Sequence, residues 1–430
     1  MMMMKQAREW RAETIAIGSE LLLGGRLDTN SLFLAEQLAS LGLEIRYKTA
    51  VGDDLADIMS VLNTAVRRAR VVVMTGGLGP TVDDLTRDAI ARATGRRLVR
   101  RKDALDGMTA RLVQWGRVPS KAQLRQALIP SGAAVLTNPV GSAPGFTLTW
   151  KGAFIAVLPG VPREMEEMVR QGVIPGLQDW LKAQEASDLR PLVRRVFHTV
   201  GLPESEVDAN LAGLIPRAMP VDLGILASPL GVLVSLTTKG KGGAGEALLD
   251  RLALDLRSRL QGWLYAEGND TMEEVVGRLL TERRFTVAVA ESCTGGLIGH
   301  RLTQVPGSST YLDRGVICYS NRAKTELLGV PPALIGEHGA VSREVAAAMA
   351  KGVRERSDVS VGLSVTGIAG PGGATPAKPV GLVYVGVDGG ADEAVTQEFR
   401  FHGDRHVIKQ RASQAALDLL RRWLLKQAMP

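Results

Sequence analysis

The stretch that most constrains the fold is Val287–Gly296, where an apolar run passes directly into a polar corner that ends in two glycines. Its first four residues, Val287 to Ala290, are small or β-branched and fit a short strand buried on both faces. Ser292 and Thr294 follow where the strand stops, and a helix is expected from Leu297 to Val305. A hydroxyl at such a turn lies near free helix N–H groups, so it is either a candidate nucleophile or an ordinary helix cap.

Length and charge limit the classes of protein to which the chain can belong. A chain of 430 residues is too long for a single hydrophobic core of ordinary size, so two to four domains are expected. The 48 glycines and 45% hydrophobic content fit an α/β fold, whereas 4% aromatic residues leave little for a platform that stacks nucleic-acid bases. The 52 Lys and Arg residues are scattered among 45 acidic residues, and the net charge is +7. A positive charge without a long basic tract favours phosphorylated small molecules over nucleic acid as partners.

The two cysteines, Cys293 and Cys318, form neither a disulfide framework nor a zinc-ligand spacing. We expect them to be small core residues, with Cys293 as an alternative nucleophile to its neighbour Ser292. The first ten residues carry charges without an apolar segment, and no apolar run reaches the ~18 residues of a membrane span. The sequence therefore predicts a cytoplasmic protein without a membrane partner.

The first part of the chain alternates short apolar strands with amphipathic helices. Strands are expected at 14–18, 44–51 and 71–74, and the helices between them end near 41 and 68. Strands separated by helices of this length imply right-handed crossovers and a parallel sheet. Ligands of such sheets bind at the carboxyl ends of the strands.

A glycine-rich loop with paired carboxylates follows the strand that ends at residue 74. The backbone of Gly76, Gly77 and Gly79 is expected to cradle a phosphate, while Asp83 and Asp84 are candidate ligands of a divalent cation that bridges two phosphates. The alternative is a tight turn with a carboxylate cap. The loop lacks both the Gly-Lys-Ser/Thr of a Walker motif and the glycine spacing of a Rossmann motif.

Three later stretches are expected to complete this site. The stretch 120–127 supplies Lys121 and Arg125, and two glycine- and proline-rich loops follow at 138–145 and 158–165. Each adjoins an apolar stretch, so we expect the loops to converge on one cleft.

The chain resembles the CinA family, the competence/damage-inducible protein A group, over essentially its whole length. The resemblance rests on four motifs in order: Gly76-Gly-Leu-Gly-Pro-Thr-Val-Asp-Asp-Leu-Thr86, Gly141-Ser-Ala-Pro-Gly145, Leu158-Pro-Gly-Val-Pro162 and Ala290-Glu-Ser-Cys-Thr-Gly-Gly296. It implies that the N-terminal part has the three-layer molybdopterin-binding-like fold of MogA and of the middle section of MoeA. It also implies hydrolysis of ADP-ribose at its pyrophosphate with a divalent metal, magnesium or cobalt, and with potassium as a further candidate ion.

The middle of the chain predicts a small α+β module, either KH-like or ferredoxin-like. Strands are expected at 192–200, 223–227 and 232–238, and helices at 204–214 and 245–260. The Gly-x-x-Gly at Gly240–Gly243 matches a KH loop in letters but joins a strand to a helix, so we interpret it as a flexible turn. Dimerisation or spacing is then a better role for the module than RNA binding, and a homodimer is expected. The predicted domains are 1–175, 176–268 and 269–430.

In the last section the expected strands end in hydroxyls, glycines or basic residues, which suggests an amidase site. A serine is a weak nucleophile and needs a base, and a partly desolvated lysine can serve. Ser292 is the predicted nucleophile, with Lys324 as its base on a helix capped by Asn321 and Tyr319 as proton shuttle. Backbone N–H groups near Gly295 or Gly367 are the expected oxyanion donors. Taken singly, each residue also has an ordinary structural role.

The same resemblance implies a nicotinamide mononucleotide deamidase that releases ammonia, leaves nicotinic acid mononucleotide and needs no cofactor. The positions that match the family's site are Ser292, Tyr319, Lys324, Thr366 and Arg405, with Thr294, Gly295, Gly296 and Gly367 as further substrate contacts. Two alternatives remain: an N-terminal domain that binds a nucleotide or pterin without catalysis, and a competence or recombination partner. The deamidase prediction requires that the Ser292 hydroxyl and the Lys324 amine meet in one pocket.

Overall fold

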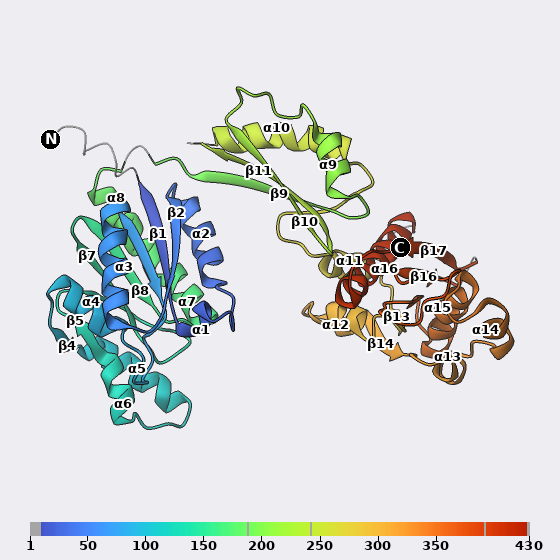
Figure 1. Ribbon diagram of the computed structural model, residues 1–430, viewed down its shortest axis with the longest axis horizontal. Coiled ribbons are helices and arrows are strands. Elements are labelled where there is room, and N and C mark those ends of the chain that lie inside the picture. The colour runs from blue at the N-terminus through green and yellow to red at the C-terminus, as the bar shows by residue number, and fades with distance from the viewer. Residues whose placement is uncertain (1–9, 187–188, 241–242, 391–392, 428–430) are drawn as a thin grey trace. The chain divides into compact units, whose positions relative to one another are not determined.

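A computed structural model describes residues 10–186, 189–240, 243–390 and 393–427. The chain divides into two compact units, the first formed by residues up to 193 with 239–245, and the second by 194–238 with 246–430. Both units are mixed α/β, as the sequence predicted (Figure 1). In the described part of the chain, no helix combines the length and the apolar character that crossing a membrane requires.

A six-stranded sheet forms the centre of the first unit, in the order β2-β1-β3-β8-β7-β6. Its strands are β1 Arg11–Ile17, β2 Glu44–Val51, β3 Val71–Thr75, β6 Ala134–Leu136, β7 Gly145–Trp150 and β8 Ala153–Leu158. The predicted parallel arrangement holds for β1, β2, β3 and β8, but β7 is antiparallel to both of its neighbours. Lys151 and Gly152, both at positive φ, join β7 to β8 in a two-residue hairpin turn.

Helices cover both faces of this sheet and make three layers. They are α2 Asn30–Ser40, α7 Pro162–Met168 and α8 Ile174–Ala183 on one face, and α3 Leu55–Arg68 and α4 Thr86–Thr94 on the other. Strand β3 shows why both faces are apolar: Val71 and Val73 pack with the first group of helices, Val72 and Met74 with the second.

Smaller elements complete the first unit. They are α1 Ser19–Leu22, β4 Leu98–Arg100, α5 Lys102–Gln114, α6 Lys121–Leu124 and β5 Leu128–Pro130, of which β4 and β5 form a separate two-stranded sheet.

The middle module is a four-stranded sheet in the order β10-β11-β9-β12 with two helices. Its elements are β9 Leu192–Thr199, α9 Glu204–Leu211, β10 Val221–Ser228, β11 Gly231–Lys239, α10 Ala244–Arg259 and β12 Leu264–Glu267. The sequence predicted all of these except β12, which has four residues and pairs with β9 across an irregular register. Residues 241 and 242 of the predicted Gly240–Gly243 turn lie outside the described residues.

The rest of the second unit is built on a five-stranded sheet, β14-β13-β15-β16-β17. The strands are β13 Val287–Glu291, β14 Leu312–Ile317, β15 Val361–Gly367, β16 Leu382–Asp388 and β17 Val395–Arg400. The first three are parallel, and β16 is antiparallel to both neighbours. The helices are α11 Met272–Glu282, α12 Leu297–Thr303, α13 Asn321–Leu328, α14 Pro332–His338, α15 Arg343–Ser357 and α16 Arg405–Lys426.

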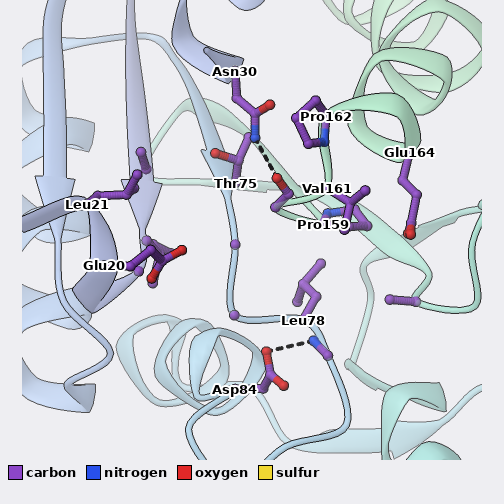
Figure 2. A pocket seen from close by; sticks show the side chains of 18 of the residues that line it. Glu20, Leu21, Asn30, Thr75, Leu78, Asp84, Pro159, Val161, Pro162 and Glu164 are labelled. Atoms are coloured by element: carbon purple, nitrogen blue, oxygen red, sulfur yellow. Dashed lines mark hydrogen bonds between the residues drawn. The ribbon is translucent and has the colours of Figure 1, made fainter. Parts of the chain in front are cut away.

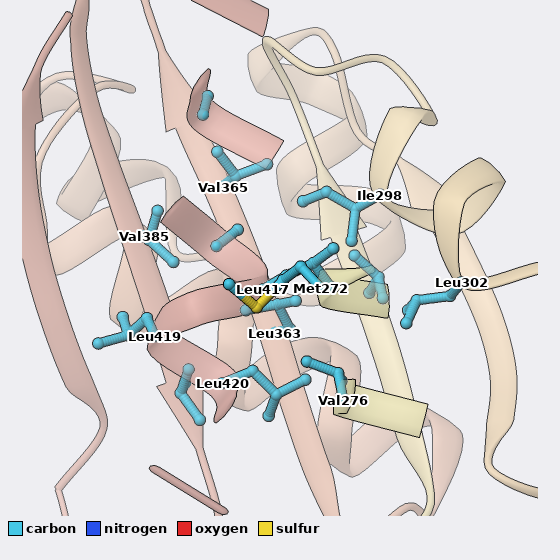
Figure 3. Packing of buried hydrophobic residues seen from close by; sticks show 14 of the residues in the cluster. Met272, Val276, Ile298, Leu302, Leu363, Val365, Val385, Leu417, Leu419 and Leu420 are labelled. Carbon is cyan, nitrogen blue, oxygen red and sulfur yellow. The ribbon is translucent and has the colours of Figure 1, made fainter. Parts of the chain in front are cut away.

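The central strand β13 is buried on both faces, so its two sets of alternate side chains join different cores. Val287 and Val289 pack with residues of α11, α12 and α16. Figure 3 shows Met272, Ile298 and Leu420, one from each of these helices, in this core. Ala288 and Ala290 join a second core formed largely by α13, α14 and α15. Because β14, β13 and β15 are parallel neighbours, they end side by side, and the turns that follow them meet at one edge of the sheet.

Candidate active site

Ser292 directly follows β13 at this edge, and its position is set by the neighbouring strand and by its own turn. Its N–H donates to the carbonyl of Val365 at 3.0 Å, and its carbonyl accepts the N–H of Gly295 at 3.1 Å. Gly295 and Gly296 have φ of 62° and 93°, a left-handed conformation that side chains disfavour. The glycine corner thus turns the chain sharply into α12 and leaves Ser292 only 7% exposed.

Glu291, the last residue of β13, holds this corner through hydrogen bonds to its side chain. Its buried carboxylate accepts the backbone N–H groups of Gly296 at 3.0 Å, Ile298 at 3.1 Å and Gly299 at 2.9 Å. A carboxylate stabilises the positive end of a helix, so Glu291 takes the capping role that Ser292 and Thr294 could have filled. Sequence reasoning overlooked it, although a glutamate at the end of an otherwise apolar strand was a visible signal.

Lys324 lies in the second turn of α13, and its amine lies close to the residues that follow β13 and β14. Its Nζ is 3.1 Å from Ser292 Oγ, 3.0 Å from the Cys318 carbonyl and 3.4 Å from the Tyr319 carbonyl. Ser320, not the expected Asn321, caps the helix, since its hydroxyl accepts the N–H of Ala323. Residues 292 and 324, which are 32 positions apart, therefore meet as the amidase prediction required.

Burial shifts the Lys324 amine towards its neutral form. The side chain is 1% exposed, and burial lowers its pKa below the ordinary lysine value. A neutral amine has two N–H donors and one lone pair. The two backbone carbonyls can accept the two donors, which leaves the lone pair directed at the Ser292 hydroxyl.

The other predicted residues take different positions around this pair. The Thr366 hydroxyl is buried and donates to the Ala340 carbonyl at 2.8 Å, which ties the end of β15 to the loop between α14 and α15. Tyr319 is 58% exposed, and its hydroxyl accepts from Arg405 at 2.8 Å. Arg405 also donates to the Gly370 carbonyl at 2.6 Å, so Tyr319 and Arg405 form an exposed pair.

The N–H of Gly295, one of the expected oxyanion donors, is engaged within the turn. The N–H of Gly295 closes the turn with Ser292, and that of Gly296 donates to Glu291. Within the described residues, the N–H groups of Cys293 and Thr294 donate to no other residue. The residue after a nucleophile commonly supplies such a donor, so Cys293 and Thr294 are better candidates than Gly295.

Neither cysteine is suited to act as the nucleophile. Burial raises the pKa of Cys293 to about 12 and that of Cys318 to about 11. Both thiols therefore stay protonated near neutral pH, whereas thiol chemistry requires the thiolate.

In the first unit, a cavity of about 420 Å³ opens at the carboxyl ends of β1, β3 and β8. Figure 2 shows Glu20, Asn30 and Asp84 among the side chains around it. Of the predicted residues, the three loop glycines and both aspartates line the cavity: Gly76, Gly77, Gly79, Asp83 and Asp84. Lys121 and Arg125 are not among its lining residues, and the neighbouring Gln126 is.

The two aspartates of the glycine loop differ in what they contact. Asp84 accepts the N–H groups of Gly79 and Thr81, each at 2.8 Å, and also the Thr81 hydroxyl. Asp83 is exposed to solvent, and the Thr81 donors are taken by Asp84. Asp84 therefore organises the loop, and Asp83 is the carboxylate free to reach a bound ion.

The residues present fit a magnesium ion only if the substrate supplies further ligands. Within the described residues, no three His, Cys, Asp or Glu side chains gather in a metal-binding arrangement. Magnesium commonly binds through one or two carboxylates together with phosphate oxygens and water, which agrees with Asp83 beside a phosphate.

The loop glycines are also required by packing alone. A Cβ on Gly76 would lie 2.1 Å from the Ile17 carbonyl, and one on Gly77 would lie 2.1 Å from the Thr86 hydroxyl. These glycines would therefore be needed for the fold even if no phosphate were bound.

Comparison with known proteins covers nearly the whole chain. The family models that match are "CinA C-terminal domain" at residues 269–424, "Probable molybdopterin binding domain" at 13–179 and "Damage-inducible protein CinA KH domain" at 194–266. A CinA-like protein of Thermosynechococcus vestitus is 43% identical over 96% of this chain and 99% of its own. One of Koribacter versatilis is 42% identical over 96% and 100%.

Among solved structures, the competence/damage inducible protein CihA from Agrobacterium tumefaciens is 40% identical. The match covers 36% of this chain and 96% of that one, with a TM-score of 0.35.

Proposed function

Because the chain belongs to the CinA family, we propose that Ser292 and Lys324 form the active site of an amidohydrolase that acts on nicotinamide mononucleotide. The products would be nicotinic acid mononucleotide and ammonia. The observation that carries the proposal is the 3.1 Å contact between Ser292 Oγ and the buried Lys324 Nζ. A desolvated lysine amine of lowered pKa is, in its neutral form, the base that the serine needs to attack a carboxamide.

The reaction follows from this geometry in two halves. In the first, Lys324 takes the proton of Ser292 as Oγ bonds to the carboxamide carbon, and the N–H groups of Cys293 and Thr294 hold the oxyanion. The protonated lysine then gives its proton to the departing nitrogen, which leaves as ammonia. In the second half, water loses a proton to Lys324 and attacks the acyl carbon. The bond from that carbon to Ser292 Oγ then breaks and the lysine returns its proton to Oγ, so the acid is released and Ser292 is restored.

The surrounding residues position these groups. Glu291 orients the corner that carries Ser292 and the oxyanion donors. Thr366 fixes the end of β15, to which the Ser292 backbone is bonded. The pair of Tyr319 and Arg405 is exposed, so it can contact a substrate.

Ammonia release from nicotinamide mononucleotide tests the proposal. We expect the wild-type chain to release ammonia, and Ser292→Ala and Lys324→Ala to lose that activity by several orders of magnitude. Lys351→Ala is a matched control, because Lys351 is an exposed residue of α15 whose nearest acid, Glu355, is 3.9 Å away. Retained deamidation in Ser292→Ala would refute the serine mechanism and favour an activated water.

For the first unit, we propose hydrolysis of the ADP-ribose pyrophosphate in the cavity beside the glycine loop. The proposal is supported by a hollow lined by loop backbone and by Asp83, the exposed carboxylate. A divalent cation held by Asp83 would neutralise phosphate charge there. The chain's own contribution is to keep the loop open, through Asp84 and through Arg87, whose guanidinium donates to the carbonyls of Leu78 and Gly79.

Asp83→Asn is the sharper test of this second activity, because it should leave the loop's hydrogen bonds in place. We expect metal-dependent turnover of ADP-ribose to fall while ammonia release is unchanged. If the wild type binds ADP-ribose without cleaving it, the first unit is a binding module. If the chain instead binds DNA with an affinity that falls steeply with salt, the proposal of a recombination partner gains support.

A further inference from the structure

Lys409 on α16 lies beside the glycine corner that follows Ser292. A Cβ built on Gly295 would be 3.6 Å from the Lys409 amine. The thiol of Cys293, whose pKa is raised chiefly by burial, also lies within the electrostatic influence of Lys409 and Lys324. Lys409 is thus a cation at the catalytic turn.

No polar contact of Lys409 within the fold explains this position. It is half-buried, and among the residues that the structure describes it forms neither an ion pair nor a hydrogen bond. Arg405, one helical turn earlier and therefore on the same face, is instead engaged by Tyr319 and Gly370. The nearest acid in sequence, Asp404, accepts the N–H of Val407 as the cap of α16. Lys409 is therefore the available cation of this helix face.

The turn places Lys409 within reach of a substrate attached at Ser292. Gly295 N–H bonds to the Ser292 carbonyl, and the ends of such a turn lie within about 7 Å of each other. Gly295 is exposed and has no side chain, so it leaves the amine open to solvent from the side of the turn. A ligand whose carboxamide meets Ser292 can extend its ribose phosphate over the glycine corner.

We propose that Lys409 binds the phosphate of the substrate and makes the site selective for a 5′-mononucleotide over its nucleoside. The inference rests on the proposed deamidase function and adds a specificity residue to it. Lysine suits this role as a compact charge that binds phosphate. Because Lys409 contacts the phosphate and not the carboxamide, it should affect the two substrates differently.

Steady-state kinetics with nicotinamide mononucleotide and nicotinamide riboside test this proposal. We expect Lys409→Met to lower kcat/KM for the mononucleotide about 10- to 100-fold, the factor for one charge-assisted hydrogen bond, mainly through KM. The riboside should be unaffected, and Lys409→Arg should retain more activity than Lys409→Met. Lys426→Met, a change at an exposed lysine on the same helix, is the matched control.

Each other outcome overturns a defined step. An unchanged kcat/KM for the mononucleotide, or an equal loss with both substrates, would remove Lys409 from phosphate recognition. If the wild type releases no ammonia at all, the deamidase proposal fails. In that case, calorimetric titration with inorganic phosphate still tests whether Lys409 binds an anion. Weaker phosphate binding by Lys409→Met than by Lys426→Met supports an anion site at Lys409, and equal binding by the two variants refutes that site.

Discussion

The buried carboxylate of Glu291 offers a direct test of how the catalytic corner is held. Its Oε2 accepts the N–H groups of Gly296 and Ile298, and its Oε1 accepts that of Gly299. In Glu291→Gln the amide keeps one oxygen, which can retain the first two bonds. Its NH₂ group then faces the Gly299 N–H, so two donors oppose each other.

The number of bonds sets the expected loss of stability. One hydrogen bond to a charged acceptor is lost, at about 1.5–3 kcal/mol, and the two that remain become neutral and weaken by about 1 kcal/mol each. Part of this loss of stability is offset because an uncharged amide costs less to bury than a carboxylate. We therefore expect Glu291→Gln to lower the free energy of unfolding of the second unit by about 2–4 kcal/mol. The corner would also shift, so kcat for ammonia release should fall at least about 10-fold.

Differential scanning calorimetry of the intact chain measures the first effect. A loss of this size in a unit of roughly 150–250 residues corresponds to a fall in Tm of about 5–15 °C. The control is Glu282→Gln, since the Glu282 side chain is 49% exposed and its ion pair with Arg283 is long, at 3.9 Å. If Glu291→Gln melts within about 1 °C of this control, the carboxylate does not hold the corner and the reasoning is wrong.

Two further predictions concern Lys324 and the glycine loop. Burial lowers the pKa of Lys324, so the folded chain binds that proton less readily than the unfolded chain, and each unit of lowering costs about 1.4 kcal/mol at low pH. The stability of Lys324→Met relative to wild type should therefore decline as pH rises from 7 towards 10.5, a trend that urea denaturation can follow; a constant difference would contradict a lowered pKa. Gly76 has φ of 108° and no room for a Cβ beside Ile17, so Gly76→Ala should lower the melting temperature of the first unit alone, while ammonia release persists. Unaltered melting would show that the loop relaxes without cost.

Local chemistry explains why much of the fold was predictable. Apolar runs rich in β-branched residues, such as Val71–Thr75, favour strands, and glycines such as Gly295 and Gly296 mark places where the chain adopts positive φ. The strand order was not predictable in the same way. The antiparallel direction of β7 depends on the hairpin at Lys151 and Gly152, and β12 is too short to have a pattern of its own.

By itself, the sequence determined the family, the alternation of strands and helices, and the residue types gathered at the strand ends. Only the tertiary structure decided what those residues do. It brought Lys324 to Ser292, gave the helix cap to Glu291, made Asp84 a loop support and placed Lys409 beside Gly295. The physical reason is that a side chain's contacts and pKa depend on every group packed around it, and most of those groups come from distant parts of the chain.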